Sequence, residues 1–312
     1  MGAATGPRFT LILSENWTMT SARDLPTLVR WARDAEDAGF DSVMISEHIV
    51  LGPGAGAQGR MANPREYALP GNQDPRTPWP SSLVLLSAIA AVTARVRLVA
   101  GAVIAPLRHP LLAARELGTL DLLSGGRLVV LPTVSWHRDE YAALGVPFRE
   151  RGALLDEHLE VWRLCWGPSP VSYHGRHYRF DDVFLEPGAF SERGPYLWLG
   201  GGAMSAKIVE RVVRYGDGFN PLGVRTDEEM ATLRGALVAA CRDPEELELV
   251  GGTRGRFRDG TSCADLGEAM AGIPAQRAQG YSTFCIKPSQ FIDDPDQVGE
   301  FCRDVVRRGE AL

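Results

Sequence analysis

Short apolar segments of strand length alternate with longer segments of helical periodicity along almost the whole chain, and no other feature constrains the fold as strongly. The first such pair is Phe9–Leu13 and Asp24–Ala38, and Gly39 follows as a typical helix stop. The same order recurs eight times within 312 residues. This count predicts an α/β fold, a closed (β/α)8 TIM barrel, with residues 1–312 as one domain. A doubly wound open sheet is the alternative, but it would more often split into two domains at this length.

Eight strands and eight helices follow from the periodicity. The predicted strands are Phe9–Leu13, Ser42–Ile45, Val96–Val103, Arg127–Leu131, Tyr196–Leu199, Asp217–Pro221, Leu247–Gly251 and Ser282–Ile286. The predicted helices are Asp24–Ala38, Ser81–Ala94, Pro110–Leu123, Arg149–Trp166, Ala203–Tyr215, Thr226–Cys241, Ala264–Gln279 and Pro295–Arg308.

Two segments interrupt the alternation. Leu51–Pro80 follows the second strand and is rich in Gly, Pro and polar residues. A loop of this length within a compact domain is usually functional or disordered, and its place at the carboxyl end of a strand favours a mobile lid over linker-like disorder. The stretch PVSYHGRHYRFDDVFLEPG alternates aromatic residues around Gly175. It predicts a hairpin insertion between the fourth and fifth units, which we expect to cover one side of the barrel mouth.

The composition excludes some classes of partner. A formal net charge of −6 argues against nucleic acid or an anionic membrane as the main partner, and leaves a small molecule as the expected one. The N-terminus has no basic region before an apolar core, and no apolar run approaches the length of a membrane span, so we expect a cytoplasmic protein. The five cysteines lack the spacing of a metal site, and we expect buried thiols and no bound metal.

Residues that directly follow the strands of a barrel line its active site. Glu47 and His48 follow the second strand; histidine titrates near neutral pH, and an acidic neighbour can tune it. Because successive strand residues face opposite sides, only one of the two can point inward, and an N-cap or a surface pair is the alternative. No Ser-His-Asp order or nucleophile elbow supports a hydrolase. Weaker candidates, for substrate contact, are Trp17, Tyr67, Trp79 and His137.

Three consecutive glycines, Gly200 to Gly202, separate the fifth strand from its helix. Backbone N–H groups left uncovered at the start of a helix bind phosphate well, whereas glycine also simply eases a tight turn. The two interpretations are equally supported by the residues alone. The pattern is not GxGxxG, so a Rossmann dinucleotide site is a poor match.

Two stretches resemble a known family. Residues 104–166, IAPLRHPLLAARELGTLDLLSGGRLVVLPTVSWHRDEYAALGVPFRERGALLDEHLEVWRLCW, are similar to the luciferase-like monooxygenase superfamily, and more narrowly to its branch that uses the deazaflavin coenzyme F420. The later run YLWLGGGAMSAKIVERVVRYGDGFNP is similar to a second hallmark of that family. The resemblance is clear from the first strand through the sixth, and rests on architecture more than on motifs in the C-terminal quarter.

The resemblance implies a flavin or deazaflavin across the carboxyl-terminal mouth of the barrel, in a protein that is often a homodimer. A non-proline cis peptide in a bulge of the third strand would lean against the ring, and it maps to Ala102–Val103. Glu47 and His48 would lie near the reactive edge of the ring. The implied cofactor-binding residues are Ala102, Val103, Val134, Ser135, Trp136, Gly200, Gly201, Gly202, Ala203, Met204 and Ser205.

One segment departs from the family pattern. The fourth strand usually ends in G-x-G-x-G-W, where this chain has Leu131 to Trp136, LPTVSW. Side chains narrow this part of the site, and Pro132 removes one backbone donor. Dehydrogenases of the family that carry a glutamate acid/base in this segment have it where Trp136 stands, which puts the sugar-dehydrogenase chemistry in doubt.

These observations predict an oxidoreductase that moves a hydride between coenzyme F420 and a small organic substrate, with secondary metabolism as the expected setting. His48 would be the proton donor or acceptor, with Glu47 tuning or positioning it. One alternative is an FMN-dependent monooxygenase supplied by a separate flavin reductase. Another is a non-catalytic barrel with a degenerate cofactor site, which the filled fourth-strand segment favours.

Overall fold

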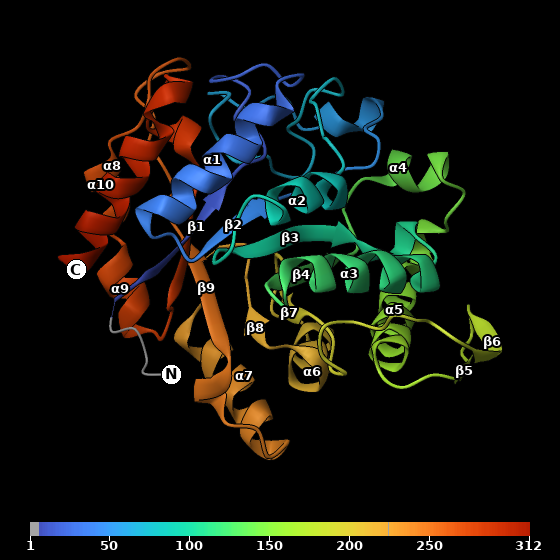
Figure 1. The fold of residues 1–312 in the computed structure, drawn as a ribbon. Helices are drawn as coiled ribbons and strands as arrows, with labels where there is room; N and C mark the ends of the chain where they lie inside the picture. Colours follow the sequence, from blue (N-terminus) through green and yellow to red (C-terminus); the bar gives the residue numbers. More distant parts are fainter. Residues whose placement is uncertain (1–5, 224) are drawn as a thin grey trace.

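The computed structural model describes residues 6–223 and 225–312, and it confirms the closed barrel (Figure 1). Eight strands pair in parallel in the order β1-β10-β9-β8-β7-β4-β3-β2, and β2 closes the ring on β1. These strands are β1 Arg8–Ile12, β2 Ser42–Ile45, β3 Arg97–Ile104, β4 Leu128–Thr133, β7 Tyr196–Leu199, β8 Gly218–Phe219, β9 Glu248–Gly252 and β10 Thr283–Ile286. The boundaries of β2 and β7 match the sequence-based prediction, and the other six strands lie within a few residues of it.

The helices form the outer layer of the barrel. They are α1 Leu25–Ala38, α2 Ser82–Ala90, α3 Pro110–Ser124, α4 Arg138–Ala143, α5 Arg151–Trp166, α6 Ala206–Tyr215, α7 Asp227–Ala239, α8 Leu266–Met270, α9 Ile273–Ala278 and α10 Val298–Glu310. Gly39 ends α1 in the left-handed conformation, and Thr226 and Glu229 form a capping box at the start of α7, as their residue types favour. None of the described helices is long and apolar enough to cross a membrane.

Strand side chains alternate between two apolar layers. Leu11, Val43 and Leu98 pack with helix residues in the large outer core, which lies between the strands and the surrounding helices. A smaller cluster fills the barrel interior and consists of Ile12, Met44, Val99, Val129, Trp198 and Val250. The period-2 alternation of a strand therefore determines which residues reach the interior of the barrel.

A buried polar cluster centres on Glu248 at the start of β9. Its carboxylate accepts hydrogen bonds from two guanidinium nitrogens of Arg97, both at 2.8 Å, from the Trp198 indole at 3.1 Å and from the Thr283 hydroxyl at 2.5 Å. Burial by itself would raise the pKa of Glu248, but the hydrogen bonds and charge of Arg97 outweigh it and lower the pKa to about 2. These contacts are at the amino ends of the strands, so they stabilise the barrel rather than form the site.

Residues 51–80, here called the lid segment, fold back onto the barrel. A short 3-10 helix, Pro53–Gly56, begins the segment, and its later part binds the loops that follow β9 and β10. Asn63 donates to the carbonyls of Asp259 and Ser262 at 3.0 and 2.9 Å. Arg65 donates to the Thr261 carbonyl at 2.7 Å and forms an ion pair with Asp293. These contacts hold the segment against the barrel, whereas its role as a mobile lid stays a prediction.

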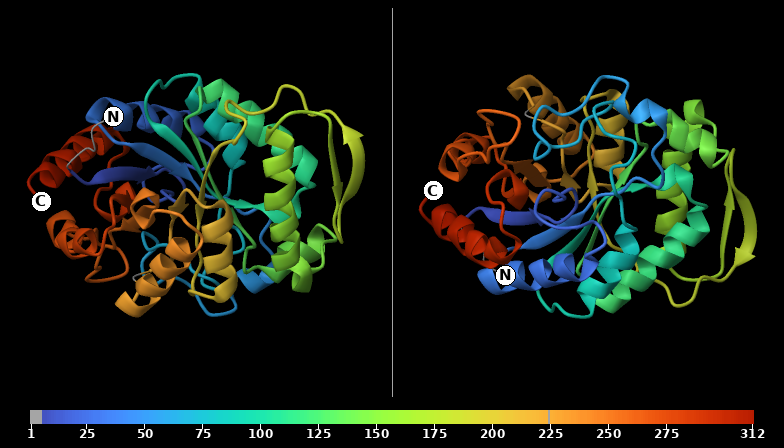
Figure 2. Two further views of the ribbon diagram at one scale, coloured as in Figure 1. Left: turned by 90° about the horizontal axis from the view of Figure 1, so that it is seen from below. Right: turned by 90° about the horizontal axis from the view of Figure 1, so that it is seen from above.

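The predicted hairpin is present as β5 Val171–His174 and β6 Arg179–Val183, but it does not cover the mouth. Both views of Figure 2 show it at the outer edge of the molecule, beyond α5. Glu157 of α5 accepts hydrogen bonds from the backbone N–H groups of residues 176 to 178, which holds the turn against that helix. The hairpin therefore packs against α5 and, through Tyr178, against His109 at the start of α3, and it does not lie across the mouth as expected.

Two further expectations need correction. The segment Ala264–Gln279 forms two short helices instead of one, because Pro274 has no N–H to continue the helical ladder and clashes with the preceding turn. The cysteines are all free, but they are not all buried: Cys165 and Cys302 are, whereas Cys241 is exposed. Cys241 sits in a left-handed turn after α7, where the chain leaves the core.

Candidate active site

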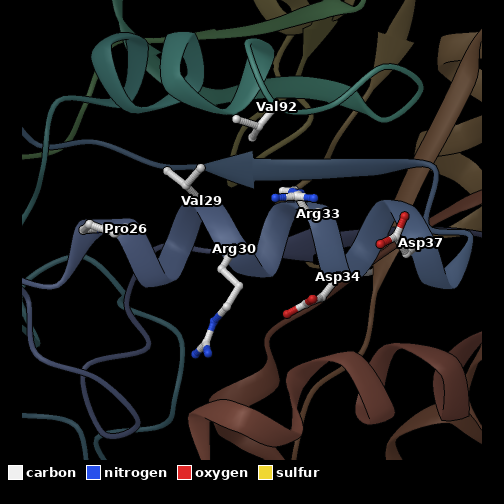
Figure 3. A pocket seen from close by; sticks show the side chains of 7 residues that line it. All are labelled: Pro26, Val29, Arg30, Arg33, Asp34, Asp37 and Val92. Carbon is white, nitrogen blue, oxygen red and sulfur yellow. The ribbon is translucent and has the colours of Figure 1, made fainter.

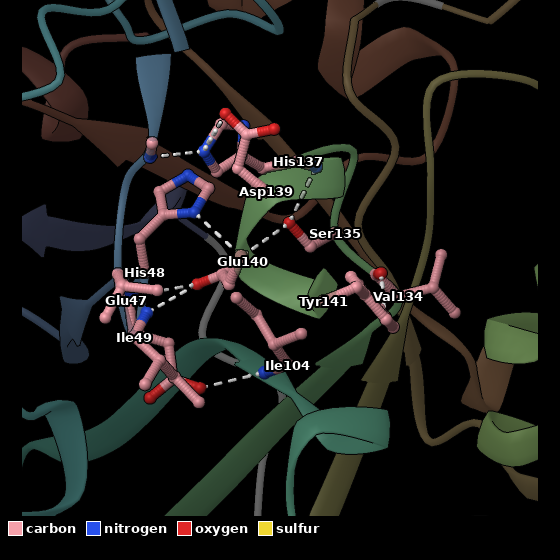
Figure 4. Close-up of polar contacts among 12 residues, drawn as sticks. Glu47, His48, Ile49, Ile104, Val134, Ser135, His137, Asp139, Glu140 and Tyr141 are labelled. Carbon is pink, nitrogen blue, oxygen red and sulfur yellow. Dashed lines mark hydrogen bonds and ion pairs between the residues drawn. The ribbon is translucent and has the colours of Figure 1, made fainter. Parts of the chain in front are cut away.

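The residues that follow β2, β3 and β4 converge at the carboxyl ends of these neighbouring strands (Figure 4). His48 comes from the loop after β2, and Ser135 and Glu140 come from the loop and helix after β4. A cavity of about 360 Å³ on the outer surface of α1 involves none of these residues and is lined by charged residues of that helix (Figure 3). The strand ends, not this cavity, carry the candidate active site.

His48 is paired with the carboxylate of Glu140. The Nδ1 atom of His48 lies 3.3 Å from Oε2 of Glu140, and both side chains are buried. Because an ionised carboxylate can only accept, Nδ1 is the donor of this pair, and in the neutral imidazole Nε2 then keeps its lone pair. Figure 4 shows Nδ1 directed at Glu140 and the other ring nitrogen pointing away from it. Among the described residues, Nε2 has no hydrogen-bond partner.

Glu140 is held in place by three further donors. The backbone N–H groups of Ile49 and Val50 donate to Oε1 at 2.5 and 3.4 Å, and the Ser135 hydroxyl donates to Oε2 at 3.1 Å. Burial would raise the pKa of Glu140. The hydrogen bond and charge of His48, together with the hydrogen bonds from Ile49 and Ser135, outweigh burial and lower this pKa below its usual range. Glu140 therefore stays ionised at neutral pH and fixes the orientation of His48.

Sequence reasoning missed Glu140 and assigned its role to Glu47. The Glu47 carboxylate is instead paired with both terminal nitrogens of Arg108, at 2.7 and 2.9 Å. It also accepts from the Ile104 N–H and from the Ser82 hydroxyl, both at 2.8 Å. Glu47 thus joins the ends of β2 and β3 to α2, and its carboxylate forms no hydrogen bond with the His48 ring among the described residues. The sequence feature that could have identified Glu140 is its place in the first turn of α4, the helix that follows β4.

Aromatic rings surround the His48 imidazole. Trp79 from the end of the lid segment packs edge-on to it with ring centroids 5.1 Å apart, and Trp136 lies at 5.7 Å. His137 is 6.2 Å away and is fully buried, and its Nε2 accepts a 2.7 Å hydrogen bond from the Gly52 N–H. Burial lowers the pKa of His137, which keeps this imidazole neutral and suited to that acceptor role. His137 therefore fastens the lid segment.

The bulge predicted in the third strand is present, but the cis peptide lies one residue earlier than expected. It joins Gly101 to Ala102, and the pairing of β3 with β4 shifts register between Gly101 and Val103. The Ala102 side chain is partly exposed at this point, whereas Val103 is fully buried in the outer core and turns away from the mouth. Of the two predicted ring contacts, only Ala102 is available.

One residue of the fourth-strand segment has a backbone conformation typical of glycine. Ser135 has φ +54°, the left-handed region that glycine adopts readily, and it stands where the family pattern has its third glycine. Val134 accepts a hydrogen bond from the Tyr141 hydroxyl through its carbonyl, and Trp136 is half-buried beside His48.

The three glycines after β7 have different roles. A Cβ atom at Gly200 would lie 1.8 Å from the carbonyl oxygen of Asn220, so this position needs glycine for the close approach of β7 to β8. A Cβ at Gly202 would meet nothing within 4 Å, and Ala203 next to it is exposed. Among the described residues, the N–H groups of Gly202 and Ala203 have no protein acceptor. The side chain of Ser205 caps α6 by accepting from the Ile208 N–H, and Met204 packs against the outer core.

A buried arginine lies beside these open N–H groups. Arg225 donates to the carbonyls of Leu222 and Gly202, at 2.9 and 3.4 Å, while its Nε is buried without a hydrogen-bond partner among the described residues. Because α6 begins at Ala206, its positive end also points to this loop. Open N–H groups, a helix N-terminus and a guanidinium fit the phosphate of a flavin or deazaflavin.

Two predicted substrate residues tie the lid segment to the barrel. The Trp17 indole donates to the Pro78 carbonyl at 3.1 Å. Tyr67 packs on the apolar interior of the barrel, and its hydroxyl donates to the Thr253 carbonyl at 3.3 Å. Burial raises the pKa of Tyr67 well above its usual range, so its phenol stays protonated. The lid segment therefore covers the interior of the barrel with an aromatic ring.

The comparisons with known proteins identify the family. Residues 8–255 match the family model of the luciferase-like monooxygenases. This chain belongs to the luciferase-like monooxygenase family. An uncharacterised protein from Mycobacterium tuberculosis is 34% identical over 219 residues, which are 68% of this chain and 74% of that protein. An FMNH2-dependent dimethylsulfone monooxygenase of Pseudomonas putida is 30% identical over 129 residues, which are 40% of this chain and 35% of that protein.

Solved structures share the luciferase-like fold. The monooxygenase RslO1 from Streptomyces bottropensis superimposes with a TM-score of 0.72 at 22% identity, over 95% of this chain and 96% of that one. An F420-dependent secondary alcohol dehydrogenase in complex with an F420-acetone adduct gives the same TM-score at 15% identity, over 97% and 99% of the two chains. The proteins similar to this chain thus include an F420-dependent dehydrogenase, by fold, and an FMNH2-dependent monooxygenase, by sequence.

Proposed function

We propose that this protein is an F420-dependent oxidoreductase that interconverts a hydroxyl and a carbonyl group on a small organic substrate. The observation that carries the proposal is the buried pair of His48 and Glu140 at the carboxyl ends of the strands. Removing a hydride from an alcohol carbon requires that the hydroxyl proton leave as well, so the reaction needs a base beside the hydride acceptor. A similar fold in an F420-dependent secondary alcohol dehydrogenase is consistent with this reaction.

The residues of this chain hold the proton and shape the site. Nε2 of His48 accepts the hydroxyl proton in the oxidative direction and returns it in the reductive one, while Glu140 stabilises the resulting imidazolium. The coenzyme supplies, when bound, the carbon that accepts or donates the hydride. The Trp79 ring packs on His48 and the Tyr67 ring packs on the barrel interior, so these two rings of the lid segment would exclude water from the site.

The phosphate of the coenzyme would bind where β7 meets α6. Gly202 and Ala203 offer open backbone N–H groups, and Arg225, which is also paired with Glu229 at 3.6 Å, would supply a guanidinium. The loop after β4, with Ser135 in its left-handed conformation, would form the other half of this site, since β4 and β7 are neighbours in the barrel. Ala102 in the β3 bulge would contact the ring.

Titration of the purified protein with coenzyme F420 and with FMN, followed by fluorescence quenching, tests the cofactor. Saturable binding of F420, and of FMN only weakly, is the expected result. The substitution His48→Ala should lower turnover by about 10²-fold to 10⁴-fold and leave coenzyme affinity within twofold. His174→Ala, on the exposed hairpin where His174 pairs with Asp181, is the matched control and should change neither. Unchanged turnover in His48→Ala would refute the assignment.

An FMN-dependent monooxygenase fed by a separate flavin reductase is the second candidate. The 30% identity to an FMNH2-dependent monooxygenase favours it. A deazaflavin has carbon at position five and cannot form the hydroperoxide that oxygen insertion needs, so the same titration separates the two. Tight binding of FMN with no F420 binding would replace the first proposal by this one, and binding of neither would favour a non-catalytic barrel.

A further inference from the structure

Lysine is rare in this chain, and one of its two lysines is buried at the barrel mouth. Of 33 basic residues only Lys207 and Lys287 are lysines. Lys207 lies on the exposed surface of α6, where it pairs with Glu210. Lys287 is the first residue after β10 and has no exposed surface. Its position at the carboxyl end of a barrel strand is where substrate-contacting residues are found.

The Lys287 ammonium has little compensation for its burial. Its Nζ donates one hydrogen bond of 2.9 Å, to the Glu66 carbonyl in the lid segment, and lies 5.7 Å from the centre of the Tyr67 ring. No carboxylate among the described residues lies within ion-pair distance of it; Glu15 acts on it only through its more distant charge. Burial accordingly lowers the pKa of Lys287. Two of its three N–H donors have no acceptor among the described residues.

Such a group is unfavourable as a structural element. A buried cation without a counter-ion costs stability, and an apolar side chain of similar length would fill the same space without that cost. The chain otherwise relies on arginine for its internal ion pairs, as with Arg97 and Arg108. The Lys287 ammonium differs from these arginines, because it is a compact charge with free N–H donors and can bind a single small anion. Nearby, the Ser289 hydroxyl is also buried without a partner among the described residues.

We propose that Lys287 is a substrate-recognition residue that binds an ionised oxygen, such as a carboxylate, on the substrate of this enzyme. The anion would take the place of the Glu66 carbonyl when the Asn63–Tyr67 part of the lid segment lifts. Both groups that cover Lys287, the Glu66 carbonyl and the Tyr67 ring, belong to that part. This inference rests on the proposed function, since it takes the barrel mouth to be the substrate site.

The lid segment has the contacts that such a movement requires. Asn63 and Arg65 attach it to the loops after β9 and β10 entirely through polar contacts, with the carbonyls of residues 259, 261 and 262 and with the Asp293 carboxylate. The hydrogen bonds of Asn63 and Arg65 can be replaced by hydrogen bonds to water when the segment lifts. The Tyr67 ring would leave its place on the apolar interior of the barrel in the same movement. Lifting would therefore expose Lys287 while the strands stay paired, and the returning lid would enclose the bound anion.

The rarity of lysine allows a direct test with benzoate as the probe anion and benzamide as its neutral counterpart. In Lys207→Arg protein labelled with ¹³C,¹⁵N-lysine, Lys287 is the single lysine signal. We expect benzoate to shift that signal in a saturable way and benzamide to leave it unchanged. Lys287→Met should weaken benzoate binding by about tenfold or more, as expected for a lost charge-assisted hydrogen bond. Its melting temperature should equal or exceed that of the parent protein, because methionine fills the site without a charge.

The outcomes separate this proposal from the proposed function. A Lys287 signal that does not respond to benzoate, or responds equally to benzamide, overturns the recognition role even if coenzyme F420 binds. The recognition role is also overturned if Lys287→Met leaves the benzoate affinity unchanged. It is overturned as well if Lys287→Met greatly lowers the melting temperature of the protein, because that result indicates a structural role. A specific benzoate response in a protein that binds neither F420 nor FMN supports the anion site and refutes the proposed oxidoreductase.

Discussion

Replacing Glu140 by glutamine is expected to reverse the tautomer of His48. Oε1 of Glu140 accepts from the N–H groups of Ile49 and Val50, so the side-chain carbonyl of a glutamine would take that place. Its NH2 group would then occupy the position of Oε2 and donate to Nδ1 of His48. In this variant the ring proton of His48 should therefore move from Nδ1 to Nε2. Nε2 is the atom that should receive the substrate proton, so it could no longer act as the base.

Two magnitudes follow from this geometry. Loss of the base function should lower kcat by about 10²-fold to 10⁴-fold, the range that general acid-base catalysis contributes. The Ser135 hydroxyl, which donates to Oε2 at 3.1 Å, must also reorient to accept, and the free energy of unfolding should fall by about 1–2 kcal/mol. Coenzyme affinity should change much less than kcat, because Glu140 touches the proposed phosphate site only through the Ser135 hydroxyl.

Long-range ¹H–¹⁵N NMR of the six histidines reports the tautomer directly, without a known substrate. Asp139→Asn is the matched control: it makes the same charge change on the same helix, where Asp139 binds the Gly54 N–H at 2.8 Å. The His48 signals should change in Glu140→Gln and persist in Asp139→Asn. An unchanged Nδ1–H tautomer in Glu140→Gln, or unchanged turnover once a substrate is identified, would refute the reasoning.

Four other outcomes are expected. The pKa of Glu248 is depressed from 4.5 to about 2, so its contribution of about 3 kcal/mol is present above pH 4.5 and is lost as the pH falls towards 2; urea unfolding of Glu248→Gln should lack this acid dependence. Gly200→Ala should lower the free energy of unfolding by about 3 kcal/mol, because its Cβ would meet a backbone carbonyl at 1.8 Å. Gly202→Ala, with open space at its Cβ, should unfold like the parent but bind coenzyme more weakly, and equal stability of the two glycine variants would contradict this. Arg65→Ala should raise amide hydrogen exchange in residues 61–69 by roughly tenfold, whereas exchange unchanged there would show that the lid segment is held elsewhere.

The sequence alone predicted the barrel because its signals are local. Strand and helix periods, the stop at Gly39 and the capping residue Thr226 each act within a few residues. The prediction of one helix over Ala264–Gln279 was wrong because of another local signal, Pro274, which interrupts that segment. The place of His48 at a strand end also followed from order along the chain, although its partner did not.

The tertiary structure decided which side chains meet. His48 and Glu140 are 92 positions apart, and only the closure of β2, β3 and β4 into one wall brings them together, while the adjacent Glu47 turns to Arg108. The same holds for Lys287, whose burial depends on a lid segment more than two hundred residues earlier in the chain. The three glycines at 200–202 looked alike in the sequence, but packing assigns the first to a close backbone approach and leaves the third open for a ligand. Local periodicity therefore determined the elements, and long-range packing determined the chemistry, because hydrogen-bond partners are chosen by distance in space and not along the chain.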